Sequence, residues 1–233
     1  MSLFSYETLA SRLWAFAMMG VARLSLRRTA NLQFWKLLGS GSGEGFTPKP
    51  NFSVYGLLCV WPSHAAAQDF IERSALMARY TRQADEVYTL YLATHAVRGS
   101  WSGGAPFECA DITPRGPIAA LTRATLKLRH IRRFWQQEPN ISARIGGNSD
   151  VVFKIGLGEL PMMQQMTFSI WPSEEAMNHF ARHEGAHAQA ISHVRQGGWF
   201  KEELYARFSI LGSHGTWHGA EPLSGLSTRK DTT

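Results

Sequence analysis

Cysteine, charge and long hydrophobic runs are all scarce in this sequence of 233 residues. Two cysteines, Cys59 and Cys109, are too few for a disulfide framework or a cysteine-rich metal cluster, and this usage favours a reducing cytoplasm. The apolar run at residues 13–22, closed by Arg12 and Arg23, is too short to span a bilayer. No basic segment precedes an apolar core at the N-terminus, so no signal peptide is expected. The sequence therefore predicts a cytoplasmic protein, with an amphipathic helix over 13–22 that packs on the core or touches lipid.

The charged residues that are present are predominantly basic. The formal net charge is +6 and the isoelectric point is about 9.6. This balance favours an anionic partner, such as nucleic acid, an anionic membrane surface or an acidic redox protein. The basic residues are scattered, so nucleic acid is not expected. The two densest basic groups have helical spacing and are predicted to form solvated helix faces: Arg23, Arg27 and Arg28, and Arg129, Arg132 and Arg133.

Three segments of the sequence recur in the same order. Their offsets are 110, 118 and 116 residues, and this agreement indicates two related halves. The matched pairs are VWPSHAAAQDF (60–70) with IWPSEEAMNHF (170–180), FWKLLGSGSG (34–43) with VFKIGLGE (152–159), and RGSWSGGAPF (98–107) with SHGTWHGAEPL (213–223).

Each half is predicted to have the element order β-α-β-β-α-β. Alternating apolar residues, as in DEVYTLYLATHAV and MTFSIWP, predict the strands. This order is typical of the ferredoxin-like motif, so the expected class is α+β, with tandem duplicated halves (1–110 and 111–223) forming an α+β barrel. Two back-to-back sheets are the alternative arrangement. A tail over 224–233 is expected to be disordered. The expected strands are 2–6, 32–38, 53–61, 86–97, 117–125, 150–158, 165–171 and 203–211, and the expected helices are 7–27, 63–79, 127–143 and 173–196.

Residues 183–187 read HEGAH, which matches the H-E-x-x-H pattern of zinc proteases. His193 follows His187 at the spacing of a third zinc ligand in the metzincin pattern. However, Ala190, a strong helix former, stands where that pattern needs glycine, and no methionine follows the motif. If the helix continues, His193 points about 120° away from His187 and cannot share its metal. A zinc hydrolase therefore stays only as an alternative.

The phase of the helix over 173–196 favours a different role for this stretch. His187 falls at the edge of an apolar stripe and Glu184 near its centre, where an unpaired polar group is costly to bury. In the other half, the corresponding positions are Met77 and Ser74, so one half alone carries the polar pair. A single inward histidine suits haem, because the porphyrin supplies four of the iron ligands. Glu184 would hydrogen-bond the imidazole or act as an acid or base. The stripe consists of Met177, Phe180, Ala181, Ala188, Ile191 and Val194.

Several segments, in order, resemble the spheroidene monooxygenase family, the carotenoid 2-ketolases of purple phototrophic bacteria. The resemblance runs from about residue 4 to residue 223. It implies an oxygen-dependent enzyme that contains haem b and receives electrons from a ferredoxin. Its expected reaction oxidises C-2 of an acyclic carotenoid to a ketone, through two hydroxylations and loss of water. The segments are FWKLLGSGSGEGFTPKPN, RGSWSG, GPIAALTRATLK, FKIGLGE, TFSIWP, GAHAQAI and GGWFKEELYARF.

The resemblance also implies roles for residues around the haem. His187 of GAHAQAI is the expected axial iron ligand, and His183 is its rival. Lys154 of FKIGLGE and Arg207 of ELYARF are expected to meet the haem propionates or a distal ligand, with structural ion pairing as their alternative role. Phe180 and Ile191 of the apolar stripe are expected to line the haem.

Other residues are expected near the substrate. Arg98 and Trp101 come from RGSWSG, and Phe46 lies in the glycine-rich loop 39–48, which is expected to gate a hydrophobic substrate. No P-loop lysine follows these glycines, so phosphate binding is not expected.

Two further reaction classes stay open at this stage. The same fold can hold a haem-dependent dehydratase that acts on an aldoxime-like substrate and needs no electron donor, or a non-enzymatic haem or lipid-binding module. The expected partners are a ferredoxin-type electron donor and an apolar carotenoid, with peripheral contact to the inner membrane and a homo-oligomer as further expectations. No nucleic acid partner is expected.

Overall fold

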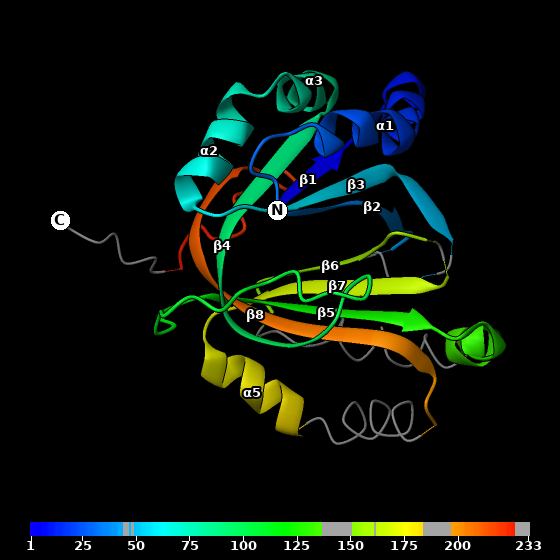
Figure 1. The fold of residues 1–233 in the computed structure, drawn as a ribbon, viewed down its shortest axis with the longest axis vertical. Helices are drawn as coiled ribbons and strands as arrows, with labels where there is room; N and C mark the ends of the chain where they lie inside the picture. The colour runs from blue at the N-terminus through cyan, green and yellow to red at the C-terminus, as the bar shows by residue number, and fades with distance from the viewer. Residues whose placement is uncertain (44–46, 48, 137–150, 161, 184–196, 227–233) are drawn as a thin grey trace.

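Eight strands form a closed barrel in the computed structural model of this protein (Figure 1). The structure describes residues 1–43, 47, 49–136, 151–160, 162–183 and 197–226, with only the backbone of 181–183. Neighbouring strands are antiparallel and follow the order β1-β3-β2-β6-β7-β5-β8-β4 around the barrel. The strands are β1 (Ser2–Ser5), β2 (Phe34–Gly41), β3 (Pro50–Val60), β4 (Glu86–Gly99), β5 (Ile118–Leu126), β6 (Phe153–Gly158), β7 (Gln164–Trp171) and β8 (Phe200–Gly215).

Helices lie on the outside of the barrel, with α1, α2 and α3 over the first half and α5 over the second (Figure 1). Serine and threonine side chains fix where the first three begin: Thr8 accepts from the backbone N–H of Ser11, and Ser63 and Ser74 cap α2 and α3 in the same way. No described helix has both the length and the apolar character needed to cross a membrane. The described helices are α1 (Leu9–Arg27), α2 (His64–Arg73), α3 (Ala75–Gln83), the 3-10 helix η1 (Leu128–His130) and α5 (Glu174–His183).

The two halves arrange their strands in the same way. Around the barrel, the first half reads β4-β1-β3-β2 and the second half reads β8-β5-β7-β6. Each half is thus a four-stranded antiparallel sheet with its helices on one face, as in ferredoxin-like proteins. Two seams, β4 with β8 and β2 with β6, join the sheets and close the barrel.

The register of the β4–β8 seam is reciprocal. Gly99, at the end of β4, pairs with Leu204 near the start of β8, and Gly215, at the end of β8, pairs with Tyr88 near the start of β4. These two pairs are equivalent if β4 and β8 are interchanged. The seam has two register shifts, and the pair Ala93–Ser209 lies between them.

Some element boundaries differ from the sequence expectation. The helix expected over 63–79 is divided into α2 and α3, because Ser74 has an extended backbone (ψ 136°) and its side chain caps α3. The strand expected over 203–211 begins at Phe200 and continues to Gly215, because pairing with β4 and β5 supports it along its whole length. Parts of the expected helices 127–143 and 173–196, and most of the expected tail, lie outside the described residues.

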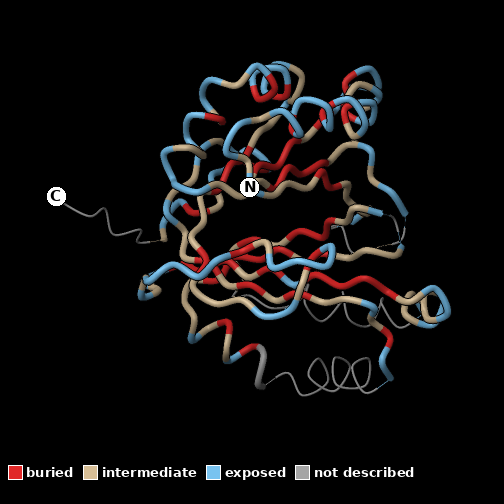
Figure 2. Tube along the Cα trace, viewed as in Figure 1, coloured by how far each residue is buried: buried red, intermediate tan, exposed pale blue. Residues whose placement is uncertain are grey.

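Two large apolar clusters stabilise the fold. One fills the barrel interior and includes Leu38, Leu121 and Phe168. The other lies between the outer face of the first sheet and helices α1, α2 and α3, where Phe4 stacks on Tyr80 with ring centroids 4.7 Å apart. Figure 2 shows the resulting pattern, in which buried segments follow the strands and exposed segments follow the outer sides of the helices. The described part of the outer cluster on the second sheet is much smaller, and this difference positions the candidate site.

Candidate functional site

The outer face of the second sheet carries smaller and more polar side chains than the outer face of the first. Strand pairing defines the equivalent positions of the two halves. At these positions, large apolar or aromatic residues of the first half correspond to small or polar residues of the second: Phe4 to Ala124, Leu37 to Gly156, Tyr55 to Gln165, and Leu57 to Thr167.

Among the described residues, the second outer face thus has less side-chain volume, and it is called the open face below in this sense. The four first-half residues are buried against helices, whereas Gln165 and Thr167 are only half-buried. Thr122, next along β5 on the same face, is exposed, while its first-half equivalent Ser2 is 1% exposed. The described side chains therefore cover the outer face of the first sheet more completely than that of the second.

Titratable groups from three elements meet at one edge of this open face. Arg207 on β8 donates to Oε1 of Glu174 on α5 at 2.6 Å. His95 lies in the irregular part of β4, with its Nδ1 3.5 Å from Oγ of Ser209. The Nε2 atom of His95 is buried and has no hydrogen-bond partner among the described residues. These four residues are called the His95 cluster below.

The surroundings of His95 favour its neutral form. Burial lowers its pKa, and the opposing contributions of Glu174, which raises it, and Arg207, which lowers it, are smaller. A neutral imidazole with one unpartnered nitrogen can accept or donate a single proton near neutral pH. The cluster therefore has the chemistry of a proton-transfer group.

Three other residues expected at the site lie on or near the same face: two in the second half, and Arg98 at the end of β4. Lys154 is on β6 opposite Ser169, so its side chain points outward, away from the barrel interior. Phe180 on α5 is buried against Trp171, with ring centroids 5.0 Å apart. Arg98 is exposed at the end of β4, with its guanidinium 5.2 Å from the ring centroid of Tyr205.

The strand register also corrects the match between residues 34–43 and 152–159. Phe34 pairs with Val60 and Phe153 pairs with Ile170, so these two phenylalanines are equivalent, one position away from the alignment that equated Lys36 with Lys154. Because side chains alternate along a strand, the two lysines lie on opposite faces. Lys36 contacts residues of the barrel interior, whereas Lys154 lies on the outer face.

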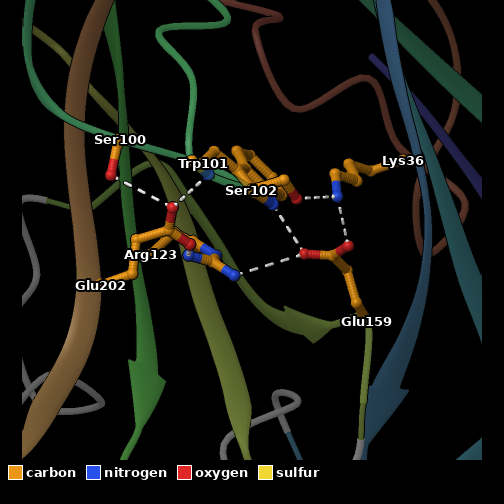
Figure 3. Close-up of polar contacts among 8 residues, drawn as sticks. Lys36, Ser100, Trp101, Ser102, Arg123, Glu159 and Glu202 are labelled. Carbon is orange, nitrogen blue, oxygen red and sulfur yellow. Dashed lines mark hydrogen bonds and ion pairs between the residues drawn. The ribbon is translucent and has the colours of Figure 1, made fainter.

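A buried ion-pair network occupies one end of the barrel interior (Figure 3). Arg123, 2% exposed, donates to Glu202 and lies 3.6 Å from Oε1 of Glu159. Lys36 contacts the other oxygen of Glu159 at 2.5 Å. Trp101 donates its indole N–H to Glu159 at 2.6 Å, with the Arg123 guanidinium 5.4 Å from its ring centroid. Trp101, expected near the substrate, is thus held within this network and is 1% exposed.

A cavity of about 990 Å³ lies beside the short strand β1. Strands β3 and β4 both pair with β1 and continue past it without pairing to each other, and the cavity lies between them. It extends from α2, at Phe70, to Trp101 and Phe107 in the barrel interior. Along β4 it reaches Thr94, the neighbour of His95. Its walls are both apolar and polar, with Leu90 and Phe208 among the apolar residues and Gln33 and Thr89 among the polar ones.

Several expected site residues lie outside the described residues. These are Phe46, Glu184, His187 and Ile191, and the side chain of His183 is likewise not described. Among the residues that the structure does describe, no three histidine, cysteine, aspartate or glutamate side chains gather in a way that could hold a metal ion. The two cysteines are free thiols; burial raises the pKa of Cys59 to about 12, so it is an inert core residue.

Sequence reasoning missed His95 and Arg123. A bulge in β4 places His95 at the open face, and no local pattern marks that bulge. Arg123 alternates with buried residues of β5, which gave a signal: a lone arginine at an inward strand position needs carboxylate partners. Its partners are distant in the sequence: Glu159 follows β6, and Glu202 lies on β8.

Comparison with known proteins identifies relatives over nearly the whole chain. The chain is 46% identical to a spheroidene monooxygenase of Cereibacter sphaeroides, covering 99% of this chain and 72% of that protein. It is 40% identical to the spheroidene monooxygenase of Rhodobacter capsulatus, covering 100% and 98%, and 34% identical to that of Rubrivivax gelatinosus, covering 90% and 81%. No protein-family model matches the chain.

Solved structures with the same fold include two aldoxime dehydratase structures. One has a TM-score of 0.52 at 12% identity, covering 90% of this chain and 80% of the other. The second, co-crystallised with butyraldoxime, has a TM-score of 0.53 at 9% identity, covering 90% and 78%. At such identities the likeness concerns the fold alone. The sequence relatives, by contrast, are 34–46% identical over most of both chains, and the protein therefore belongs to the spheroidene monooxygenase family.

Proposed function

We propose that this protein is a haem-dependent monooxygenase that oxidises C-2 of an acyclic, spheroidene-like carotenoid to a ketone. The relatives are named for a reaction on spheroidene. The observation that supports a cofactor is the contrast between the two outer sheet faces, of which one carries large buried side chains and the other, among the described residues, small or polar ones. In a fold built from two similar halves, such a contrast is the expected trace of a single cofactor site.

The residues present on the open face fit haem. The side chains on the strands of this face are small, so a planar ring could lie close to the backbone: they are Ala124, Gly156 and Thr167. Phe180 would add an aromatic contact at the side. Lys154 and Arg207 are cations suited to propionate carboxylates. His187 would be the axial iron ligand and Ile191 a further wall residue, and both assignments rest on the sequence. When bound, haem would supply the dioxygen activation that hydroxylation of an unactivated C–H bond requires.

The overall stoichiometry sets what the protein must deliver. Each hydroxylation places one oxygen atom of O2 on C-2, and the second oxygen atom leaves as water after uptake of two electrons and two protons. Two rounds give a geminal diol, which loses water to become the ketone. We assign the electrons to a ferredoxin-type donor, attracted by the positive net charge.

The protein's own residues would handle the protons. His95 Nε2 is buried, unpartnered among the described residues, and carried by an imidazole whose neutral form is favoured. It can therefore relay one proton at a time, with Ser209 close to the other ring nitrogen. Glu174 orients Arg207 beside it through their ion pair. Glu184 stays a second candidate acid or base.

The cavity beside β1 is the proposed binding site for part of the carotenoid chain, which would contact its apolar residues, such as Leu90 and Phe208. It adjoins the His95 cluster along β4, so one end of an elongated molecule bound there would lie near the open face. Arg98, Trp101 and Phe46 are the substrate-side residues that the family resemblance adds.

The absorption spectrum of the purified, haem-loaded protein tests the cofactor assignment. We expect a Soret band that shifts on reduction with dithionite. His187→Ala should lose this band and keep a native far-UV circular dichroism spectrum, and the matched variant His183→Ala should retain it. A folded protein that takes up no haem, or a His187→Ala variant with full haem occupancy, contradicts the proposal.

A haem-dependent dehydratase is the second candidate, and the shared fold with aldoxime dehydratase favours it. Dehydration of an aldoxime needs neither oxygen nor a net supply of electrons. Turnover of an aldoxime without a reductant, together with no oxygen-dependent oxidation of spheroidene, would support this reaction in place of the monooxygenase. If the folded protein stores haem or lipid without turnover of either compound, it is a binding module.

We also infer that the barrel arose by tandem duplication of a ferredoxin-like unit. The reciprocal register of the β4–β8 seam and the identical strand order of the halves support this inference. So do the two Trp-containing turns at 101–104 and 217–220, each of which is bound by a glutamate from the other half: Glu202 and Glu86, respectively.

A further inference from the structure

Helix α1 has two apolar faces. One is buried on the first sheet through Ala15, Met18, Ala22 and Leu26. The opposite face points to solvent with large side chains: Leu9 is 73% exposed, Leu13 61%, Phe16 57% and Leu24 62%. A surface helix of a globular protein is expected to be polar on its outer face, so this second stripe needs a partner.

The exposed stripe continues onto neighbouring segments. Phe16 makes an edge-on contact with Phe52 of β3, with ring centroids 5.8 Å apart. Both rings line a small apolar pocket of about 180 Å³ together with Leu160 and Met162. Met162 also lines an open hollow beside the helical segment 128–136.

That segment adds another apolar strip to the same surface. Leu128, Ile131 and Trp135 line the open hollow, Leu128 is 73% exposed, and the Trp135 indole donates to the carbonyl of Met162 at 3.0 Å. Helix α1, the first residues of β3 and the segment 128–136 all lie toward the right-hand side of Figure 1. Every exposed large hydrophobic residue of the described chain except Leu211 belongs to these three segments or is Leu160 or Met162, and all of these together are called the α1 surface below.

The charges along the α1 surface have one sign. Helix α1 contains arginine at positions 12, 23 and 27 and no acidic residue, and Arg28 caps its C-terminus. The segment 128–136 contains Arg129, Arg132 and Arg133 and likewise no acidic residue. Apolar side chains flanked by arginines on a helix that lies flat on the protein are typical of attachment to an anionic bilayer surface.

We propose that the α1 surface attaches this protein to the surface of an anionic lipid bilayer. A second copy of the chain fits this surface less well. A two-fold interface on α1 would bring the arginines of both copies together, and like charges would repel. A bilayer instead offers hydrocarbon to the leucines and phosphate groups to the arginines. This proposal rests on surface residues and does not depend on the haem or on the reaction.

Vesicle flotation with the full-length protein tests the proposal. We expect the protein to float with vesicles of phosphatidylcholine and phosphatidylglycerol and to bind vesicles of phosphatidylcholine alone more weakly. Leu13→Ser/Leu24→Ser should weaken the partition coefficient at least about tenfold, because two exposed apolar side chains no longer enter the bilayer. The matched control is Leu211→Ser, 48% exposed in the wild-type protein but outside the α1 surface, and should bind like wild type.

A second set of variants tests the charges. Arg23→Gln, Arg27→Gln and Arg28→Gln should each weaken binding to the anionic vesicles by about fivefold and leave binding to phosphatidylcholine almost unchanged. Because these side chains are exposed, the variants should fold normally, which far-UV circular dichroism checks.

Light scattering coupled to size-exclusion chromatography shows whether a second copy of the chain, and not a lipid bilayer, covers the α1 surface. If wild type is a dimer that Leu13→Ser/Leu24→Ser converts to a monomer, and neither binds vesicles, the surface is an interface between copies and the proposal is wrong. Equal vesicle binding by the leucine variant, the arginine variants and the Leu211→Ser control would also overturn it.

Discussion

Arg123 shows how a single residue distinguishes the two halves. It occupies an inward position of β5 whose equivalent on β1 is Leu3, a residue of the interior cluster. Its charge is balanced by Glu202 and Glu159, and its ring partner is Trp101. A buried charge of this kind stabilises the fold only while all of its partners are present.

Replacing the arginine by its first-half equivalent should therefore be costly. We expect Arg123→Leu to lower the free energy of unfolding by about 3–5 kcal/mol, because the partly buried Glu202 loses its ion-pair partner and Glu159 keeps only Lys36. Urea unfolding followed by far-UV circular dichroism measures the change. The control is Arg73→Leu, whose pair with Asp69 is exposed (79% and 61%), and it should cost less than about 1 kcal/mol. Equal losses in the two variants would show that the network contributes no more than a surface pair.

Replacing His95 tests its role in proton transfer. Leu211 is its equivalent on β8, so His95→Leu places a residue that the fold already accepts at the matching position. If His95 relays protons, this variant should lower the rate of product formation roughly a hundredfold. The Soret band and the urea midpoint should stay close to those of wild type. His95→Gln, which keeps a hydrogen-bonding side chain but does not titrate, should be equally slow; recovery of activity in that variant would indicate hydrogen bonding in place of proton transfer.

The sequence predicts Lys154 and Phe180 at the second-half site, from a motif and from helix phase. Both lie on or near the outer face of the second sheet, and their roles there stay predictions. Trp101 is expected at the substrate but is also bound to Glu159, which follows β6 and is distant in the sequence. A contact across the barrel depends on register, and one sequence without its strand pairing does not specify register.

Two tight turns, at 101–104 and 217–220, connect the two halves of the barrel through close backbone contacts. Each follows a long strand and contains a tryptophan: Trp101 after β4 and Trp217 after β8. The preceding glycines have positive φ angles of 99° at Gly99 and 91° at Gly215. In both cases a Cβ atom would collide with a backbone carbonyl oxygen of the other half. The turns thus depend on close approach between the halves.

Gly99→Ala should destabilise the protein by about 3 kcal/mol, because the added methyl group combines an unfavourable φ with a collision against the carbonyl of Glu203. Thermal or urea unfolding measures this loss. Gly104→Ala is the matched control within the same turn: its φ is not positive, and nothing lies within 4 Å of the added Cβ. A loss in the control as large as that in Gly99→Ala would contradict the steric explanation.

Secondary structure was largely predictable, because periodicity and capping act over short distances. The alternation in DEVYTLYLATHAV placed β4, and the Trp-Pro-Ser matches aligned β3 with β7 and α2 with α5. The break at Ser74 was missed, since a serine between two apolar turns of helix is equally compatible with a continuous helix. The length of β8 was missed because its last residues gain their support from β4.

At the scale of the whole molecule, two carboxylates tie the halves together. Glu202 accepts hydrogen bonds from the turn after β4, and Glu86 accepts them from the turn after β8. Burial alone would raise the pKa of each, but the backbone and side-chain hydrogen bonds outweigh it and lower the pKa below the ordinary glutamate value of 4.5.

The free energy of unfolding should therefore decrease as the pH is lowered through the acid range. A group whose pKa is lower in the folded protein contributes stability that is present above 4.5 and is lost as pH falls through the folded value. Urea midpoints measured from neutral pH to about pH 3 should show a loss below 4.5 that is smaller in Glu86→Gln/Glu202→Gln, because neither position then titrates. An identical acid loss in the double variant would assign it to other groups.

The barrel itself was predictable from the repeat, because two ferredoxin-like sheets with apolar inner faces must pack together or close on each other. Closure through the β4–β8 and β2–β6 seams is confirmed by the structure. The open outer face was only indirectly visible as small residues in the second half. Which of two similar faces is filled depends on side-chain packing across several strands at once.

The pairing of Ala93 with Ser209 at the middle of the β4–β8 seam has a consequence for how such a protein can change. In a dimer of two identical subunits, every mutation occurs in both subunits, so a change that improves one surface also alters the equivalent surface. In a single chain the two halves mutate independently, and here the equivalent residues Ala93 and Ser209 already differ. Each half of the barrel is thereby free to acquire side chains that the other lacks, as the outer faces of the two sheets already show.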